Sequence, residues 1–277
     1  MAPGAATTAK RAAVALDRLR PPPDGLTILI YHRVGGGSRA SVDLPTSLFD
    51  EQVAFLAERC RIYSLTEAAD LLAADLASRP AGLDHGRPCV TLTFDDGTAD
   101  FIDHALPVLA RHGVPATYYL ATDFIDRQVA FPDGARPMTW VQAGEMVSTG
   151  LVEVGSHTHT HALLDRVSRA DAASELDRSI GSIEDHLGVR PQHFAYPKAV
   201  LGSTDAQAEV RRRFRTAAIA RTRPNPWRGT DLHRLNRSPV QVADGMEFFE
   251  HKVRGGMHLE NDLRDVANRW RYRGARR

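Results

Sequence analysis

Two short segments of this sequence concentrate side chains that can bind a metal ion or move a proton. The first is Asp95-Asp96-Gly97, and the second holds His157, His159 and His161 within five residues. Carboxylate oxygens and neutral imidazole nitrogens are common ligands of divalent metals. Together the two segments predict a metal-dependent hydrolytic site with three protein ligands, an activated water and a carboxylate base.

The spacing assigns a role to most of these residues. A separation of four puts His157 and His161 on one side of a helical turn, as chelation requires. With Asp96 they form the predicted ligand set, and Asp95 is the predicted base that takes a proton from water. The role of His159 stays open, because it points away from the pair in a helical turn and joins it in an extended segment.

Each segment also has a purely structural interpretation. In the first, one aspartate caps the following helix and Gly97 supplies an unusual backbone angle. In the second, the histidines lie on a surface loop and have no functional role. Both segments follow directly on apolar strands, where parallel α/β folds collect their functional groups, and this shared position favours a metal site.

The elements that must position these residues alternate along the chain. Strands separated by one helix each imply parallel pairing with right-handed crossovers. We therefore expect an α/β sheet or barrel with its chemistry at the carboxyl ends of the strands. The expected strands are 26–31, 90–94, 116–121, 151–154, 194–196 and 216–220, and the expected helices are 48–56, 64–72, 105–110, 141–148 and 168–187.

Composition limits the class of protein. The chain has 277 residues, 43% of them hydrophobic and 25% charged, which is the balance of a globular domain with one sizeable core. A formal net charge of +1 gives no field that would attract nucleic acid, so no nucleic-acid partner is expected. Cys60 and Cys89 lack the spacing of a redox or zinc motif, and we expect buried free thiols.

We divide the chain into a basic N-terminal arm (1–25), a catalytic domain (26–260) and a basic C-terminal tail (261–277). The arm is interpreted either as solvated or as a short amphipathic helix over 7–20 with Lys10 on its polar side. It contains no apolar run long enough for a signal peptide or a membrane span, so a cytoplasmic location is expected. The basic clusters at both ends predict weak peripheral contact with the inner face of a membrane.

Five short motifs, taken in order, resemble those of the polysaccharide deacetylases, the carbohydrate esterase family 4 that contains the NodB homology domain. The resemblance implies a distorted parallel (β/α) barrel of about seven strands and the removal of an N-acetyl, or sometimes O-acetyl, group from a sugar. It places the family's base on Asp95, its metal ligands on Asp96, His157 and His161, and the hydroxyl beside the first ligand histidine on Thr158. The matching segments are 30–34, 93–97, 115–119, 154–161 and 194–197.

The sequence departs from the family pattern at 195–199, which is Ala-Tyr-Pro-Lys-Ala where many members have Arg-x-Pro-aromatic-Gly. The arginine that steers the base is thus missing from its usual place, and Arg237 is the candidate substitute. The turn glycine is also missing. The backbone N–H expected to stabilise the oxyanion belongs to Lys198, whose charge would add to the effect.

The general acid needs its own assignment, because the usual late Leu-x-x-His of the family is absent. His32 ends the first expected strand, at the edge of the barrel where the metal site is predicted. His233 and His251 lie outside the family pattern. We therefore assign the acid to His32, with an orienting role for its ring as the alternative.

The resemblance predicts an enzyme that removes the N-acetyl group from an acetylamino sugar, oligosaccharide or glycoconjugate and releases acetate. Its expected cofactor is a divalent metal, Zn²⁺ first, with Co²⁺, Ni²⁺ and Fe²⁺ as alternatives, since this ligand set accepts all four. Two other functions stay open. One is a catalytically impaired paralogue that only binds sugar, and the other is a metal-dependent hydrolase of a different non-peptide amide.

Overall fold

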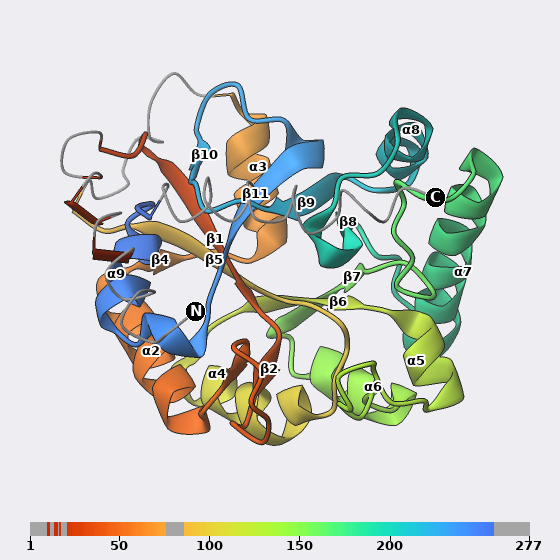
Figure 1. Cartoon of the computed structure of the whole chain (residues 1–277), viewed down its shortest axis with the longest axis horizontal. Helices are drawn as coiled ribbons and strands as arrows, with labels where there is room; N and C mark the ends of the chain where they lie inside the picture. Colours follow the sequence, from red (N-terminus) through yellow and green to blue (C-terminus); the bar gives the residue numbers. More distant parts are fainter. Residues whose placement is uncertain (1–9, 12–13, 16, 18–20, 76–85, 258–277) are drawn as a thin grey trace.

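Parallel strands close into a barrel at the centre of the molecule (Figure 1). The computed structural model describes residues 10–11, 14–15, 17, 21–75 and 86–257. Within that part of the chain seven strands form the ring, because the first strand pairs with both the last and the fifth. In spatial order they are β1 (Gly25–Tyr31), β11 (Leu235–Pro239), β9 (Thr216–Ala220), β8 (His193–Ala195), β7 (Val152–Ser156), β6 (Ala116–Leu120) and β5 (Cys89–Phe94).

Short strands extend or flank the ring. β10 (Asn225–Pro226) runs antiparallel to β1, and β4 (Arg61–Ile62) runs parallel to β5. β2 (Arg33–Val34) and β3 (Asp43–Leu44) form a separate parallel pair, which follows the carboxyl end of β1. The parallel (β/α) barrel of about seven strands that the sequence predicts is confirmed.

Helices surround the barrel on its outer side (Figure 1). Ser64 and Glu67 form a capping box at the start of α3, which lies where a helix over 64–72 was expected. Three helices outside the expected list, α5, α8 and α9, are also present among the described residues. The helices are α2 (Thr46–Arg59), α3 (Leu65–Ala73), α4 (Leu106–His112), α5 (Thr122–Arg127), α6 (Trp140–Ser148), α7 (Arg169–Leu187), α8 (Thr204–Arg213) and α9 (Glu247–Val253), with shorter turns η1 (Phe101–Ala105), η2 (Pro197–Ala199), η3 (Leu232–Arg234) and η4 (Val242–Asp244).

An aromatic cluster anchors the strand that leads into the aspartate pair. The ring of Phe94, the last residue of β5, lies 5.2 Å from Tyr31, 5.8 Å from Phe49, 4.8 Å from Phe101 and 5.9 Å from Tyr118, centroid to centroid. All five side chains are buried. Such pairs each contribute about 0.5–1.5 kcal/mol beyond the area they bury. The cluster therefore fixes the end of β5, and with it the start of the following turn.

The ends of the chain fall mostly outside the described residues, including the whole predicted C-terminal tail and its basic cluster. Lys10, predicted on the polar side of the arm, is instead 6% exposed and forms an ion pair with Asp244. Lys252 binds the same carboxylate at 2.8 Å. At Lys10 the solvated interpretation of the arm is therefore wrong. No helix in the described ranges combines the length and apolar character that a membrane crossing needs.

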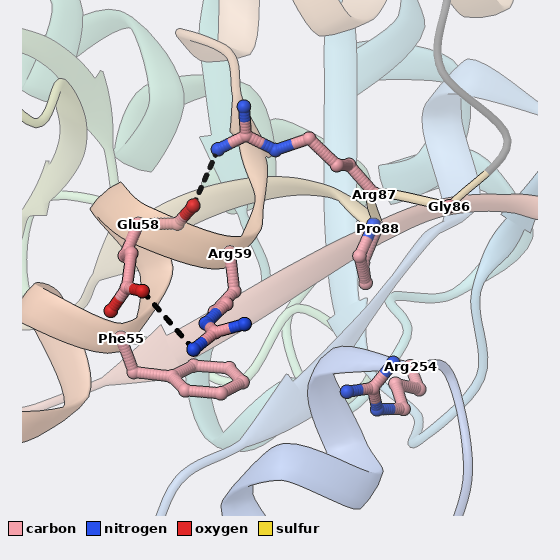
Figure 2. A pocket seen from close by; sticks show the side chains of 7 residues that line it. All are labelled: Phe55, Glu58, Arg59, Gly86, Arg87, Pro88 and Arg254. Carbon is pink, nitrogen blue, oxygen red and sulfur yellow. Dashed lines mark hydrogen bonds and ion pairs between the residues drawn. The ribbon is translucent and has the colours of Figure 1, made fainter.

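The amino end of the barrel carries a cavity of about 320 Å³ (Figure 2). Arg87 donates a hydrogen bond of 2.7 Å to the carbonyl of Glu58, and Arg59 pairs with the carboxylate of Glu58 at 3.1 Å. These cations bind the end of α2, where the helix dipole is negative. Pro88 directly precedes β5, so the cavity lies at the opposite end of that strand from Asp95. Its lining is Phe55, Glu58, Arg59, Gly86, Arg87, Pro88 and Arg254.

Candidate metal centre

The aspartate pair stands in a tight turn at the carboxyl end of β5. Asp96 (φ 84°) and Gly97 (φ 103°) both adopt left-handed backbone conformations, which favour glycine. The next helical turn begins after Asp100 and receives no side-chain cap from it. The helix-capping interpretation of Asp95 and Asp96 is therefore wrong, and both carboxylates are available for other contacts.

Asp96, His157 and His161 come together as the sequence predicts. The Oδ1 atom of Asp96 lies 3.7 Å from Nε2 of His157 and 3.5 Å from Nε2 of His161. One ligand atom from each residue falls within 4.8 Å of the others. Metal–ligand bonds of about 2.0–2.1 Å in a tetrahedron place ligand atoms about 3.4 Å apart. The observed separations thus leave room for one divalent ion between the three side chains.

The protonation of the two histidines suits metal binding. The Nδ1–H of His157 donates to the carbonyl of Ala195 at 2.8 Å, which leaves the lone pair of Nε2 directed at the cluster. Burial lowers the pKa of His157 to about 4, and burial together with the neighbouring His157 lowers that of His161 to about 4. Both rings are therefore neutral near pH 7, as ligands must be. The residues present fit a divalent metal.

Asp95 lies beside this candidate ligand set and is bound by a buried arginine. The guanidinium of Arg237 donates two hydrogen bonds to its carboxylate, at 2.6 and 2.9 Å, and Arg237 is completely buried. Burial alone would raise the pKa of Asp95, but the charge of Arg237 holds it well below its usual range. Asp95 is thus an oriented carboxylate that stays ionised, with Oδ2 4.0 Å from Nε2 of His157.

The sequence indicated Arg237 as a partner of Asp95, but it did not indicate the residues that hold the Arg237 side chain in place. Its guanidinium also donates to the hydroxyl of Thr93 at 3.1 Å and lies 5.0 Å from the ring centroid of Tyr119. Thr93 stands two residues before Asp95 on β5, so strand alternation puts the two side chains on the same face. The alternation of side chains along this strand is the sequence signal that could have identified Thr93 and Asp95 as joint partners of Arg237.

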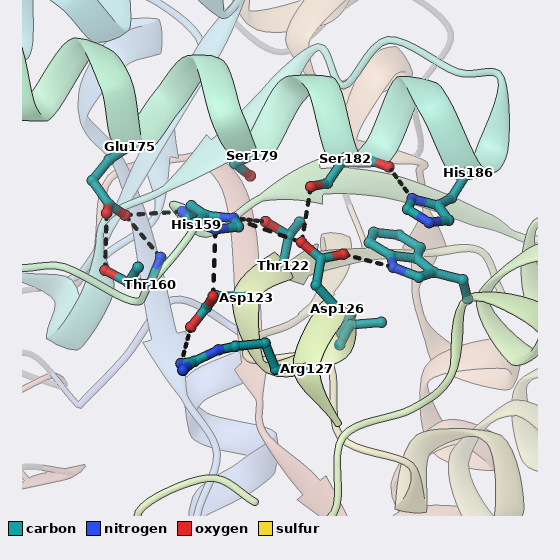
Figure 3. A network of polar contacts seen from close by, with 12 residues as sticks. Thr122, Asp123, Asp126, Arg127, His159, Thr160, Glu175, Ser179, Ser182 and His186 are labelled. Atoms are coloured by element: carbon teal, nitrogen blue, oxygen red, sulfur yellow. Dashed lines mark hydrogen bonds and ion pairs between the residues drawn. The ribbon is translucent and has the colours of Figure 1, made fainter. Parts of the chain in front are cut away.

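His159, whose role the spacing left open, faces away from the ligand set. Its Nδ1 lies 2.8 Å from the hydroxyl of Thr122 and its Nε2 lies 3.4 Å from a carboxylate oxygen of Asp123. Both of these partners belong to the start of α5, as Figure 3 shows. His159 is therefore a buried structural histidine of the loop that carries the two candidate ligands.

Strained backbone gathers around the centre. Besides Asp96, left-handed φ angles occur at Thr158 (64°), His161 (60°), Lys198 (54°) and Ala199 (57°). Such conformations cost roughly 1–3 kcal/mol each in residues other than glycine and cluster at functional sites. Ala199 holds this angle where the family pattern has glycine. The side chain of Lys198 is exposed, and its charge is among the causes, behind burial, that lower the pKa of His161.

His32 lies at the same end of the barrel, directly after β1. Its Nδ1 atom is buried and has no hydrogen-bond partner among the described residues. Behind burial, Arg237 and His157, the ring of His32 also acts on the pKa of Asp95, which places it close to the centre.

The other two histidines considered from sequence lie elsewhere. His233 precedes β11, at the amino end of the barrel, and its Nε2 is hydrogen bonded to the carbonyl of Phe214 at 2.9 Å. His251 belongs to α9 on the outside of the barrel. Neither is brought to the ligand set.

Comparison with known proteins agrees with this geometry. The family model for polysaccharide deacetylase matches residues 82–214. YxkH of Bacillus subtilis (strain 168) is 27% identical over 81% of this chain and 74% of its own length. The poly-beta-1,6-N-acetyl-D-glucosamine N-deacetylase of Escherichia coli (strain K12) is 29% identical over 50% of this chain, which spans only 21% of that larger protein.

A solved structure resembles the whole barrel. IcaB from Ammonifex degensii superposes with a TM-score of 0.69 and 26% identity, covering 84% of this chain and 98% of that one. The motifs, the barrel and the position of the aspartate and histidine segments define a NodB-type deacetylase fold. Residues 82–214 match the polysaccharide deacetylase family, and the whole barrel resembles a structure of that fold.

Proposed function

We propose that this protein is a metal-dependent N-deacetylase that hydrolyses the acetamido group of an acetylamino sugar, oligosaccharide or glycoconjugate. The observation that carries the proposal is the pairing of two different carboxylates side by side. Asp95 is clamped and kept ionised by Arg237, whereas Asp96 faces His157 and His161. A base and a ligand set in contact are what metal-assisted amide hydrolysis requires.

Asp96, His157 and His161 would hold the metal. When bound, a divalent ion in such a site polarises a carbonyl and lowers the pKa of water. Zn²⁺ is our first assignment, and the ligand types also accept Co²⁺, Ni²⁺ and Fe²⁺. The name of the Escherichia coli relative supports an acetylated glucosamine polymer as the substrate class.

The remaining residues carry the proton transfers. Asp95 takes a proton from the attacking water, and Arg237 fixes the direction of its carboxylate. The backbone N–H of Lys198 stabilises the negative oxygen that develops when the C–O bond forms. His32 donates a proton to the leaving nitrogen as the C–N bond breaks. The products are acetate and a sugar with a free amine.

The test is acetate release from oligomers of N-acetylglucosamine with β-1,4 and β-1,6 linkages. We expect the metal-loaded protein to release equal amounts of acetate and free amine, and a chelator to abolish this until metal is added back. Asp95→Asn should remove turnover while metal content stays nearly unchanged, because asparagine keeps the shape but cannot accept the proton.

Three outcomes would contradict the proposal in different ways. Tight sugar binding without any acetate would favour the impaired, sugar-binding paralogue. Release of ammonia or of another acid from a different amide would favour a hydrolase of that amide. Complete loss of metal from Asp95→Asn would mean that Asp95 is a ligand and that its role has been exchanged with that of Asp96.

A further inference from the structure

The loop between the two ligand histidines is held by a side chain from α7. The carboxylate of Glu175 accepts hydrogen bonds from the backbone N–H of His159 at 3.1 Å, from the N–H of Thr160 at 2.8 Å and from the Thr160 hydroxyl at 2.9 Å. Figure 3 shows these three contacts meeting at one carboxylate. Hydrogen bonds to an ionised acceptor are stronger than neutral ones.

The opposite side of the same loop is held by the first turn of α5. The carbonyl of His159 accepts the N–H of Asp123 at 2.9 Å, and the carbonyl of Thr158 accepts the N–H of Thr122 at 3.4 Å. Glu175 therefore binds the N–H groups of the loop, while α5 binds its carbonyls. Because His161 and Thr158 adopt left-handed angles, the loop needs contacts of this kind to keep its shape.

We propose that Glu175 is a positioning residue for the metal centre, which it serves by fixing the 158–160 loop so that His161 stays opposite His157. This inference rests on the proposed function, since it takes His157 and His161 to be ligands. Glu175 itself does not belong to the ligand set. Groups that orient metal ligands typically change metal affinity by about 10–100-fold when they are removed.

The experiment compares Glu175→Ala with Glu175→Gln in the full chain. We expect Glu175→Ala to raise the dissociation constant for Co²⁺ by about 10–100-fold, measured with a chromophoric chelator. In the metal-free protein, amide hydrogen exchange of His159 and Thr160 should accelerate by at least about tenfold. Glu175→Gln should restore most of both properties, because its carbonyl accepts the N–H groups and its NH₂ donates to the hydroxyl.

Glu184→Ala is the matched control. It lies on the same helix and pairs with Arg190 at 2.8 Å, away from the loop. If the role of Glu175 were purely structural, Glu175→Ala would lower the midpoint temperature of thermal unfolding. Its affinity for Co²⁺ would stay unchanged at temperatures well below that midpoint, and that result would overturn the inference. If the wild-type chain bound no metal, the proposed function would fail, and unchanged amide exchange in Glu175→Ala would separately show that Glu175 does not hold the loop.

Discussion

The two ends of the barrel each bury a histidine, and they use it differently. His157 follows β7 at the carboxyl end, and His193 begins β8 at the amino end; each is 2% exposed, and burial lowers the pKa of each to about 4. His193 has partners for both nitrogens, the hydroxyls of Thr216 at 2.9 Å and Thr66 at 3.1 Å. In His157 only Nδ1 is hydrogen bonded, and Nε2 faces Asp96 at 3.7 Å.

This contrast separates a proposed metal ligand from a histidine that is only buried. A lowered pKa reports that a histidine is buried, and it is the same at both ends of the barrel. The difference lies in the second ring nitrogen, which is satisfied in His193 and directed at other ligand atoms in His157. Unused hydrogen-bonding capacity that converges on one point is therefore the more specific sign of function.

The largest expected effect comes from exchanging these two histidines for glutamine, one at a time. His157→Gln should weaken metal binding by more than about 100-fold, beyond the usual effect of residues that only orient ligands. His193→Gln should leave metal affinity within about twofold, because it touches no ligand. Isothermal titration with Zn²⁺ measures both, and comparable losses in the two variants would remove the distinction drawn here.

A second test uses His32, which also has a buried nitrogen without a partner. His32→Ala should lower kcat by at least about 100-fold with metal still bound, within the range of general acid catalysis. The alkaline limb of the kcat/KM profile should flatten as well. His251→Ala, on the outside of the barrel, should change kcat little. An unchanged alkaline limb would assign the ring of His32 to orientation and leave another group as the donor.

The pair of Asp95 and Arg237 gives a third test. Arg237→Lys keeps a positive charge but loses the two-point contact, so we expect kcat/KM near pH 7 to fall by about tenfold. Because Arg237 holds the pKa of Asp95 below its usual range, weakening the contact should raise that pKa. The acid limb of the kcat/KM profile should therefore move to higher pH. An acid limb at the wild-type position would show that Asp95 is not the titrating base.

The smallest effect concerns stability at the amino end. The pKa of His193 is about 4 in the folded chain and close to 6.5 when unfolded, so the unfolded state binds more protons between these values. Its contribution to stability is complete above pH 6.5 and is lost as the pH falls towards 4. When the pH is lowered from 6.5 to 5.5, the free energy of unfolding of the metal-free wild type should fall by about 1 kcal/mol more than that of His193→Gln. Urea unfolding at both values measures this, and parallel losses would contradict it.

Much of the barrel could be predicted because its strands are apolar and its helices have caps. The expected strand at 26–31 and the expected helix at 64–72 correspond to observed elements within one or two residues. β11 was not predicted, since Leu-Asn-Arg-Ser-Pro carries no apolar pattern. Its central residue, Arg237, is buried only because the closed ring brings Asp95 next to it. Backbone pairing with β1 and β9, and not local propensity, makes this segment a strand.

The site was predictable to the extent that its residues are adjacent in sequence. Asp95, Asp96, His157 and His161 stand in two dense motifs at strand ends. The role of Glu175 could not be predicted, because the sequence of a long helix does not show whether an acidic residue faces water or contacts a loop sixteen residues earlier. Its contacts depend on how α7 packs against the barrel.

The pairing of Asp95 with Arg237 also constrains the order of events during synthesis. The two residues are 142 positions apart, and ribosomes add about 5–20 residues per second, so about 7–30 s separate their appearance. A buried carboxylate without its partner costs about 3–5 kcal/mol. The nascent barrel thus gains its full stability only after β11 has emerged. Chains stopped before residue 235 should therefore remain sensitive to proteases, because Asp95 would lack its buried partner.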